Sequence, residues 1–110
     1  MAREPLKALT ESMFYVLMSL LRQERCGAEI VQDAEEATAG RVRLGPGTLY
    51  TILAKFEEEG LVCVTAVEGR KRTYAITACG QALFRQELCR LKRCVADGER
   101  AARDAGEETG

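Results

Sequence analysis

The segment from Gly45 to Ile76 constrains the fold of this 110-residue chain more than any other part. Gly45-Pro46-Gly47 predicts a helix start, because a proline in the first helical turn loses no hydrogen bond. Gly60 predicts the helix end, since glycine readily adopts the left-handed conformation that follows a helix. The apolar residues between them recur at helical spacing and predict one buried face, made by Leu49, Ile52, Leu53 and Phe56.

Two β-strands are predicted directly after this helix, at residues 62–67 and 73–76. Residues 68–72 join them, with Gly69 in the turn and three consecutive cations at the tip. The chain therefore predicts an amphipathic helix that leads straight into a hairpin with a basic end.

Three further helices and a short strand are predicted around this segment. Thr10 is a suitable helix cap, and apolar residues at three- and four-residue steps predict a first helix over residues 10–23. A second helix is predicted between Gly27 and Gly40, and the alternating residues 41–44 predict a short strand. Thr77 is a suitable cap for a long fourth helix.

This order predicts an α+β, mainly helical fold, a winged helix-turn-helix with a long C-terminal dimerisation helix. The second and third helices would form the helix-turn-helix, and the hairpin would be the wing. The expected divisions are a DNA-binding domain at residues 6–77, the dimerisation helix at 78–103 and a disordered tail at 104–110.

The composition argues against catalysis. The chain has no histidine, which removes the commonest general base and the commonest metal ligand. No segment resembles a glycine-rich phosphate loop. We therefore expect no enzyme activity, no metal site and no cofactor. No apolar run approaches the roughly 18 residues of a membrane span, and residues 1–5 lack a signal core, so we expect a cytoplasmic protein.

The five cysteines are odd in number and include no Cys-x-x-Cys pair. This pattern disfavours a disulfide framework or a zinc site and predicts reduced, mostly buried thiols. A redox-sensing thiol is the alternative, with Cys89 and Cys94 as its candidates.

The net charge of −1 does not by itself indicate a nucleic-acid partner, but the charges are unevenly distributed. Residues 1–40 carry four basic and seven acidic side chains, whereas residues 41–76 carry six basic and four acidic ones. Residues 77–110 are balanced. A local positive stripe on the middle segment is therefore compatible with an acidic protein.

The predicted third helix and the wing are the candidate DNA surface. A recognition helix buries one face and presents small polar and basic groups on the other, near its N-terminus. Cations on a tight hairpin suit phosphate contacts. The plainer alternatives are an ordinary amphipathic helix and a solvated charged turn. The candidates are Thr48, Tyr50, Thr51 and Lys55 on the helix and Arg70, Lys71 and Arg72 on the wing.

The predicted fourth helix carries an apolar stripe at heptad-like spacing. Part of this stripe would pack on the domain core, but a helix of about 25 residues exceeds what one small domain covers. We expect dimerisation, with extra apolar surface of the first helix as the partner. The predicted interface residues are Phe14, Met18, Phe84, Leu88, Leu91 and Val95.

The chain resembles the PadR-like transcriptional regulators, specifically their short subfamily. Its most specific match is Leu44-Gly45-Pro46-Gly47-Thr48-Leu49-Tyr50. The remainder of residues 6–95 agrees in spacing, through Leu9-Thr10-Glu11 with Phe14-Tyr15, Gly40-x-Val42-x-Leu44, Glu59-Gly60-Leu61-Val62, Gly69-Arg70-Lys71-Arg72-x-Tyr74 and Ile76-Thr77-x-x-Gly80.

The resemblance implies a homodimeric repressor that binds a roughly palindromic operator. It implies that the helix from Thr48 to Lys55 enters the major groove, that the wing touches the flanking backbone, and that Tyr15 lies close to DNA. Some short members of that family bind flat hydrophobic compounds at the dimer interface, so a small-molecule effector is possible. The absence of tryptophan disfavours such stacking here. Cys26-Gly27-Ala28 also replaces the usual His-Gly-Tyr.

Two classes of function therefore stay open. The first is an operator-binding repressor, with or without an effector. The second is a winged-helix module that binds another protein instead of DNA. The basic wing favours the first, and the overall acidity keeps the second under consideration.

Overall fold

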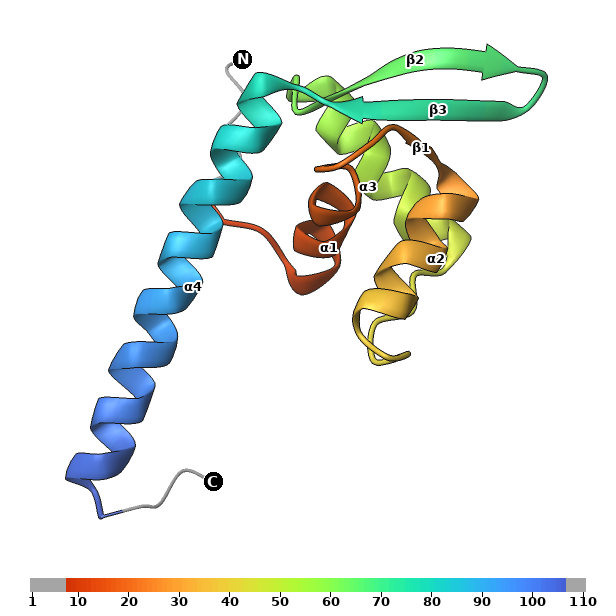
Figure 1. Cartoon of the computed structure of the whole chain (residues 1–110). Coiled ribbons are helices and arrows are strands. Elements are labelled where there is room, and N and C mark those ends of the chain that lie inside the picture. The colour runs from red at the N-terminus through yellow and green to blue at the C-terminus, as the bar shows by residue number, and fades with distance from the viewer. Residues whose placement is uncertain (1–7, 107–110) are drawn as a thin grey trace.

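The computed structural model describes residues 8–106 as one helical body with a projecting hairpin and a long final helix (Figure 1). The elements in chain order are α1 (Glu11–Ser19), β1 (Arg25–Cys26), α2 (Gly27–Ala37), α3 (Pro46–Glu58), β2 (Val62–Glu68), β3 (Lys71–Ile76) and α4 (Ala78–Asp104). This arrangement confirms the predicted α+β, mainly helical class. None of these helices has an apolar stretch long enough to cross a bilayer.

The first helix begins as predicted but ends earlier. The Thr10 side chain caps α1 by accepting a hydrogen bond from the Met13 amide at 3.2 Å. The helix was predicted to continue to residue 23, but it stops at Ser19. The next residues turn the chain back so that Arg25 and Cys26 can pair with β3. Tertiary pairing therefore overrides a helical pattern that continues in the sequence.

The predicted strand at residues 41–44 is wrong. Val42 and Leu44 are buried and Arg41 and Arg43 are exposed, so the alternation is real, but the segment is a loop between α2 and α3. Alternation reports which side chains face the core and does not require a partner strand. The short strand of this fold is β1, which the sequence pattern did not indicate.

The sheet has three antiparallel strands in the order β1-β3-β2. Val62 pairs with Ile76 and Glu68 pairs with Lys71, and an irregularity in the register lies between Val64 and Ala66. Strand β1 is short and pairs with Thr73 and Tyr74, in the middle of β3. The outer part of β2 and β3 consequently projects from the body as the wing (Figure 1).

The core lies where α1, α2 and α3 meet the base of the sheet. All four apolar residues predicted for the inner face of α3 are buried, with Phe56 completely enclosed. Tyr74 of β3 and Phe84 of α4 extend this core toward the wing and the last helix.

The last helix packs on the body only through its first half. The Thr77 hydroxyl accepts a hydrogen bond from the Gly80 amide and donates one to the carbonyl oxygen of Gly60, which fixes the start of α4. The 27 residues of α4 span about 40 Å, so its second half extends beyond the other elements (Figure 1). Of the tail predicted at 104–110, Asp104 ends the helix, and residues 107–110 lie outside the described part of the chain.

Candidate nucleic-acid interface

The structure gives α3 the two faces that a recognition helix needs. Pro46 occupies the first turn and Gly45 precedes it as the N-terminal flanking residue. With the apolar face buried in the core, Thr48, Tyr50 and Thr51 are exposed and Lys55 is partly exposed. The polar candidates therefore lie on one accessible side of the helix.

Tyr50 joins this helix to the wing. Its side chain is 53% exposed and lies across the start of α2, where a Cβ on Gly27 would be 2.8 Å from the tyrosine hydroxyl. Glycine at position 27 therefore leaves the space that Tyr50 occupies. A pocket of about 320 Å³ lies beside it and is lined by Cys26, Gly27, Ala28, Tyr50, Arg70, Lys71 and Arg72. The structure thus brings Tyr50 and the three wing cations to one groove.

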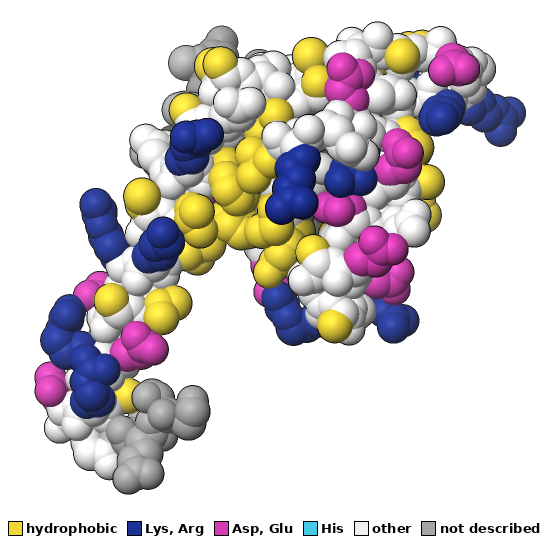
Figure 2. Space-filling model, in the orientation of Figure 1, with side chains coloured by type: hydrophobic (Ala, Val, Ile, Leu, Met, Phe, Trp, Pro, Cys, Tyr) yellow, Lys and Arg dark blue, Asp and Glu magenta, His cyan; other side chains and the backbone are white. Residues whose placement is uncertain are grey.

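The wing turn is tighter than predicted. Glu68 and Lys71 still pair across the hairpin, so the turn contains only Gly69, which has a positive φ of 61°, and Arg70. Lys71 and Arg72 belong to β3 instead of the tip. All three cations are exposed, and within residues 8–106 none of them forms an ion pair. Figure 2 shows basic side chains gathered at the free end of the wing.

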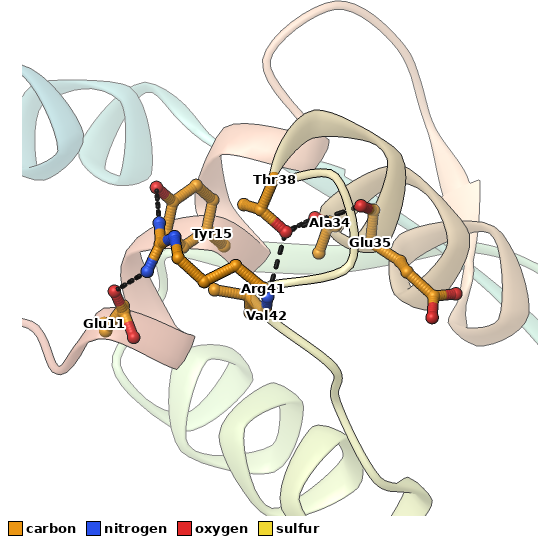
Figure 3. Close-up of polar contacts among 7 residues, drawn as sticks. All are labelled: Glu11, Tyr15, Ala34, Glu35, Thr38, Arg41 and Val42. Atoms are coloured by element: carbon orange, nitrogen blue, oxygen red, sulfur yellow. Dashed lines mark hydrogen bonds and ion pairs between the residues drawn. The ribbon is translucent and has the colours of Figure 1, made fainter.

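Tyr15 lies in a cluster that the sequence analysis did not predict (Figure 3). The Arg41 guanidinium donates a hydrogen bond to the Tyr15 hydroxyl at 3.0 Å and to a carboxylate oxygen of Glu11 at 2.6 Å. Its central carbon also lies 5.8 Å from the centre of the Tyr15 ring. The hydrogen bond that Arg41 donates to Glu11, the negative charge of Glu11 and the contact with Tyr15 together raise the pKa of Arg41. Thirty residues separate Glu11 from Arg41, so no local pattern could have revealed their contact.

The loop that carries Arg41 is fixed by its own hydrogen bonds. The Thr38 hydroxyl donates to the carbonyl oxygen of Ala34 at 2.8 Å and accepts from the Val42 amide at 2.9 Å (Figure 3). Ala39 and Gly40 both have positive φ, at 51° and 82°. A left-handed alanine is uncommon, and such residues often occur at functional positions.

The predicted dimer residues occupy two different environments. Phe14 and Phe84 are buried and stack on each other within the chain, with ring centres 4.8 Å apart. Met18 and Leu91 are partly buried. Leu88 is 37% exposed on the half of α4 that packs on the body, and Val95 is 59% exposed on the half that extends beyond it. Figure 2 shows hydrophobic side chains gathered where α4 meets the rest of the molecule.

Glu87 anchors α4 and was missed by the sequence analysis. Its side chain is only 3% exposed, and its carboxylate accepts hydrogen bonds from the Leu9 amide at 2.7 Å and from Arg90 at 2.8 and 2.9 Å. The Arg90 hydrogen bonds are the main cause that lowers the pKa of Glu87, against the opposing effect of burial. The spacing of Glu87 and Arg90 is visible in the sequence, but the contact with Leu9 is not.

The prediction that most cysteines are buried is wrong. Only Cys26 is buried, where it precedes α2, and Cys63, Cys79, Cys89 and Cys94 are exposed. Three of these four lie on α4, which has few neighbours, so the small apolar character of a thiol does not determine its burial there.

A helix-turn-helix followed by a β-hairpin wing places the chain in the winged-helix class of DNA-binding folds. The model of the PadR-like transcriptional regulator family matches residues 16–86, and the chain belongs to that family.

Solved structures share this fold, and one curated protein matches part of the sequence. The structure of RosR from H. salinarum superposes with a TM-score of 0.66 at 25% identity, over 86% of this chain and 97% of that one. The structure of Bacillus subtilis PadR in complex with operator DNA gives a TM-score of 0.61 at 21% identity, over 69% of this chain and 46% of that one. An uncharacterised 37.1 kDa protein of transposon TN4556 from Streptomyces fradiae is 36% identical over 63 residues, which are 57% of this chain and 18% of that protein.

Proposed function

We propose that this regulator is a cytoplasmic, non-catalytic repressor that binds a roughly palindromic operator as a homodimer. The observation that carries the proposal is the groove shared by Tyr50 of α3 and the cations Arg70, Lys71 and Arg72 of the wing. A duplex seated on α3 would meet these cations with its phosphates. The structure of B. subtilis PadR in complex with operator DNA supports DNA binding by a protein of this fold.

The two parts of this surface would have different roles. Thr48 and Thr51 are short hydroxyl side chains near the start of α3, where they could reach base edges in the major groove. Arg70, Lys71, Arg72 and Lys55 would contact phosphates, which position the protein and supply affinity without reading sequence. Tyr15 would contact the duplex beside α3.

The acidic net charge does not oppose this role. Glu57, Glu58 and Glu59 lie at the C-terminal end of α3, away from the end that carries Thr48 and Thr51. At physiological salt, charges separated by more than about 8 Å are largely screened. The local excess of cations on the wing can therefore dominate at the DNA.

The dimer would form through the exposed apolar face of α4. Leu88 and Val95 are exposed there, and Leu91 and Met18 are only partly covered. Phe14 and Phe84 would lie beneath this surface and support it. Two copies related by twofold symmetry would present two recognition helices, which requires an operator with matching symmetric half-sites.

A small-molecule effector would have a candidate place at the predicted interface, in a pocket of about 240 Å³ between α1 and α4. Its lining residues are Leu9, Thr10, Glu11, Phe14, Tyr15 and Leu91. Because Phe14 already stacks on Phe84, no aromatic pair is open to hold a flat ligand between its rings at this point. We therefore propose an effector only as a secondary feature.

The proposal is tested by titrating the purified protein with DNA from beside its own gene and with a scrambled duplex of equal length. A specific operator should bind at least about 1,000-fold more tightly than the scrambled duplex. Equal affinity for both duplexes would contradict the proposal of sequence-specific binding. Failure to bind either duplex at low salt would instead favour a winged-helix module that recognises a protein.

A further inference from the structure

The loop between α2 and α3 holds two exposed arginines that already have carboxylate partners. Arg41 pairs with Glu11 at 2.6 Å and Arg43 pairs with Glu35 at 3.3 Å. The wing cations differ, because none of them has an ion-pair partner in the described part of the chain. In the described part of the chain, the wing cations therefore lack ion-pair partners, whereas the two loop arginines are each paired with a carboxylate.

The loop and the wing lie at opposite ends of α2. The residue before α2, Cys26, pairs with Thr73 of β3 at the wing base, whereas the loop starts at Thr38 beyond the other end of the helix (Figure 1). Eleven helical residues span about 16 Å. The major groove is about 12 Å wide between its two phosphate backbones. A duplex seated on α3 with one backbone at the wing would therefore bring its other backbone near the loop.

Arg41 is prepared for such a contact. Hydrogen bonds from Thr38 to Ala34 and from Val42 to Thr38 fix the loop backbone. The Tyr15 hydroxyl accepts a hydrogen bond from the Arg41 guanidinium. The side chain of Arg41 is 57% exposed and that of Glu11 is 63% exposed, so a phosphate can approach the pair. Exposed ion pairs are weak, and a phosphate accepts two parallel hydrogen bonds from a guanidinium.

We propose that Arg41 is a second phosphate-binding residue on the far side of α3 from the wing, and that Glu11 holds it until DNA takes its place. This inference rests on the proposed DNA binding. In the free protein the Glu11 carboxylate pairs with the Arg41 guanidinium. In the complex a backbone phosphate pairs with the guanidinium in place of Glu11. Tyr15 remains in contact with Arg41 in both states and limits its movement. Glu11 thereby acts as a competitor that lowers the affinity for every sequence.

The test measures binding of the full chain to its operator and to a scrambled duplex by fluorescence anisotropy at several salt concentrations. Arg41→Gln should weaken binding to both duplexes by roughly tenfold and lower the log–log salt slope of a dimer by about 2, since each protomer loses one phosphate contact. Glu11→Gln should strengthen binding to both by about three- to fivefold, because one weak competing pair per protomer is removed.

Two controls separate competition from other effects. Asp97→Asn removes the same charge from a similar exposed pair, Asp97 with Arg100 at 2.7 Å, on the outer part of α4. It should leave affinity unchanged. In an Arg41→Gln background, Glu11→Gln should no longer strengthen binding, because the arginine for which Glu11 competes with phosphate is already gone. Thermal unfolding midpoints of all variants show whether each protein remains folded.

The outcomes are distinct. If the wild-type protein binds no DNA, the proposed function and this inference both fail. If it binds but Glu11→Gln matches Asp97→Asn, the competition is absent and only this inference fails. A gain from Glu11→Gln that persists without Arg41 shows simple charge repulsion and also overturns it. Loss of thermal stability without any change in affinity assigns the cluster a structural role only.

Discussion

At Gly80 the backbone of α4 comes so close to the chain before the wing that no side chain fits. A Cβ at this position would collide with the carbonyl oxygen of Leu61 and lie 2.7 Å from the Ile76 side chain. Because Leu61 and Ile76 flank the hairpin, Gly80 determines how closely the last helix approaches the wing. Single residues of this kind position the elements that carry the DNA surface.

Gly80→Ala should lower the free energy of unfolding by about 1–3 kcal/mol, the range for forcing extra volume into a packed site. Gly98→Ala on the same helix is the matched control, because nothing lies within 4 Å of a Cβ there. That change should raise stability by up to about 1 kcal/mol through helix propensity. Urea unfolding of both variants measures the two effects. Equal responses would show that the close approach at Gly80 is unimportant.

Glu87 should make the free energy of unfolding depend on pH in the acidic range. Its pKa is lowered from the ordinary value of 4.5, mainly by Arg90, so its ionised form stabilises the fold above that value. This contribution is lost as the pH falls through the lower folded-state pKa. Glu87→Gln should therefore be less stable than the wild type near neutral pH, and the difference should shrink below about pH 4.5. Urea unfolding across this range measures it. A difference that does not change with pH would rule out the charged interaction.

At the scale of elements, the sequence predicted the helices better than their ends. Gly-Pro-Gly and the apolar spacing gave α3 correctly, and Thr10 and Thr77 gave two real caps. The end of α1 and strand β1 depend on pairing with β3, which lies about 50 residues further along the chain. The contact between Glu11 and Arg41 also joins residues that are far apart in the sequence, so the sequence could not reveal it. Tyr15 was predicted through family resemblance, but Arg41 is recognisable only once Glu11 and the loop are brought together.

The wing makes an element-scale prediction. Arg70→Ala combined with Arg72→Ala should weaken binding to all DNA sequences and flatten the salt dependence, because phosphate contacts carry no sequence information. Thr51→Ala on α3 should instead weaken binding to the operator more than to scrambled DNA. Parallel titrations of both duplexes distinguish the two. Equal losses from Thr51→Ala would remove it from the base-reading set, and a sequence-selective loss from the wing variant would contradict its role.

At the scale of the whole molecule, α4 is longer than one body can cover. Phe84 and Glu87 hold its inner half, while Leu88 in the inner half and Val95 in the outer half remain exposed. The structure also changes which residues test the dimer. Leu91 packs partly on the chain's own core, so altering it would disturb folding as well as association.

Leu88→Asp with Val95→Asp should give a folded monomer, because charged side chains would then have to be buried without partners in the interface. Sedimentation measures the mass, and circular dichroism confirms that α4 remains helical. Gln86→Asp with Cys89→Asp, at exposed positions outside the apolar stripe, is the control and should stay dimeric. A dimer that survives the first pair of changes would refute this interface.

The central claim is that a dimer of this chain binds DNA through its wing and α3, and the salt dependence of wild-type binding tests it most directly. If Lys55, Arg70, Lys71 and Arg72 together place about three charges per protomer on phosphates, a dimer makes about six such contacts. The slope of log affinity against log salt is then about −5. Contacts from Arg41 in both protomers would steepen the slope to about −7. A slope near zero, or no binding at low salt, would contradict the account.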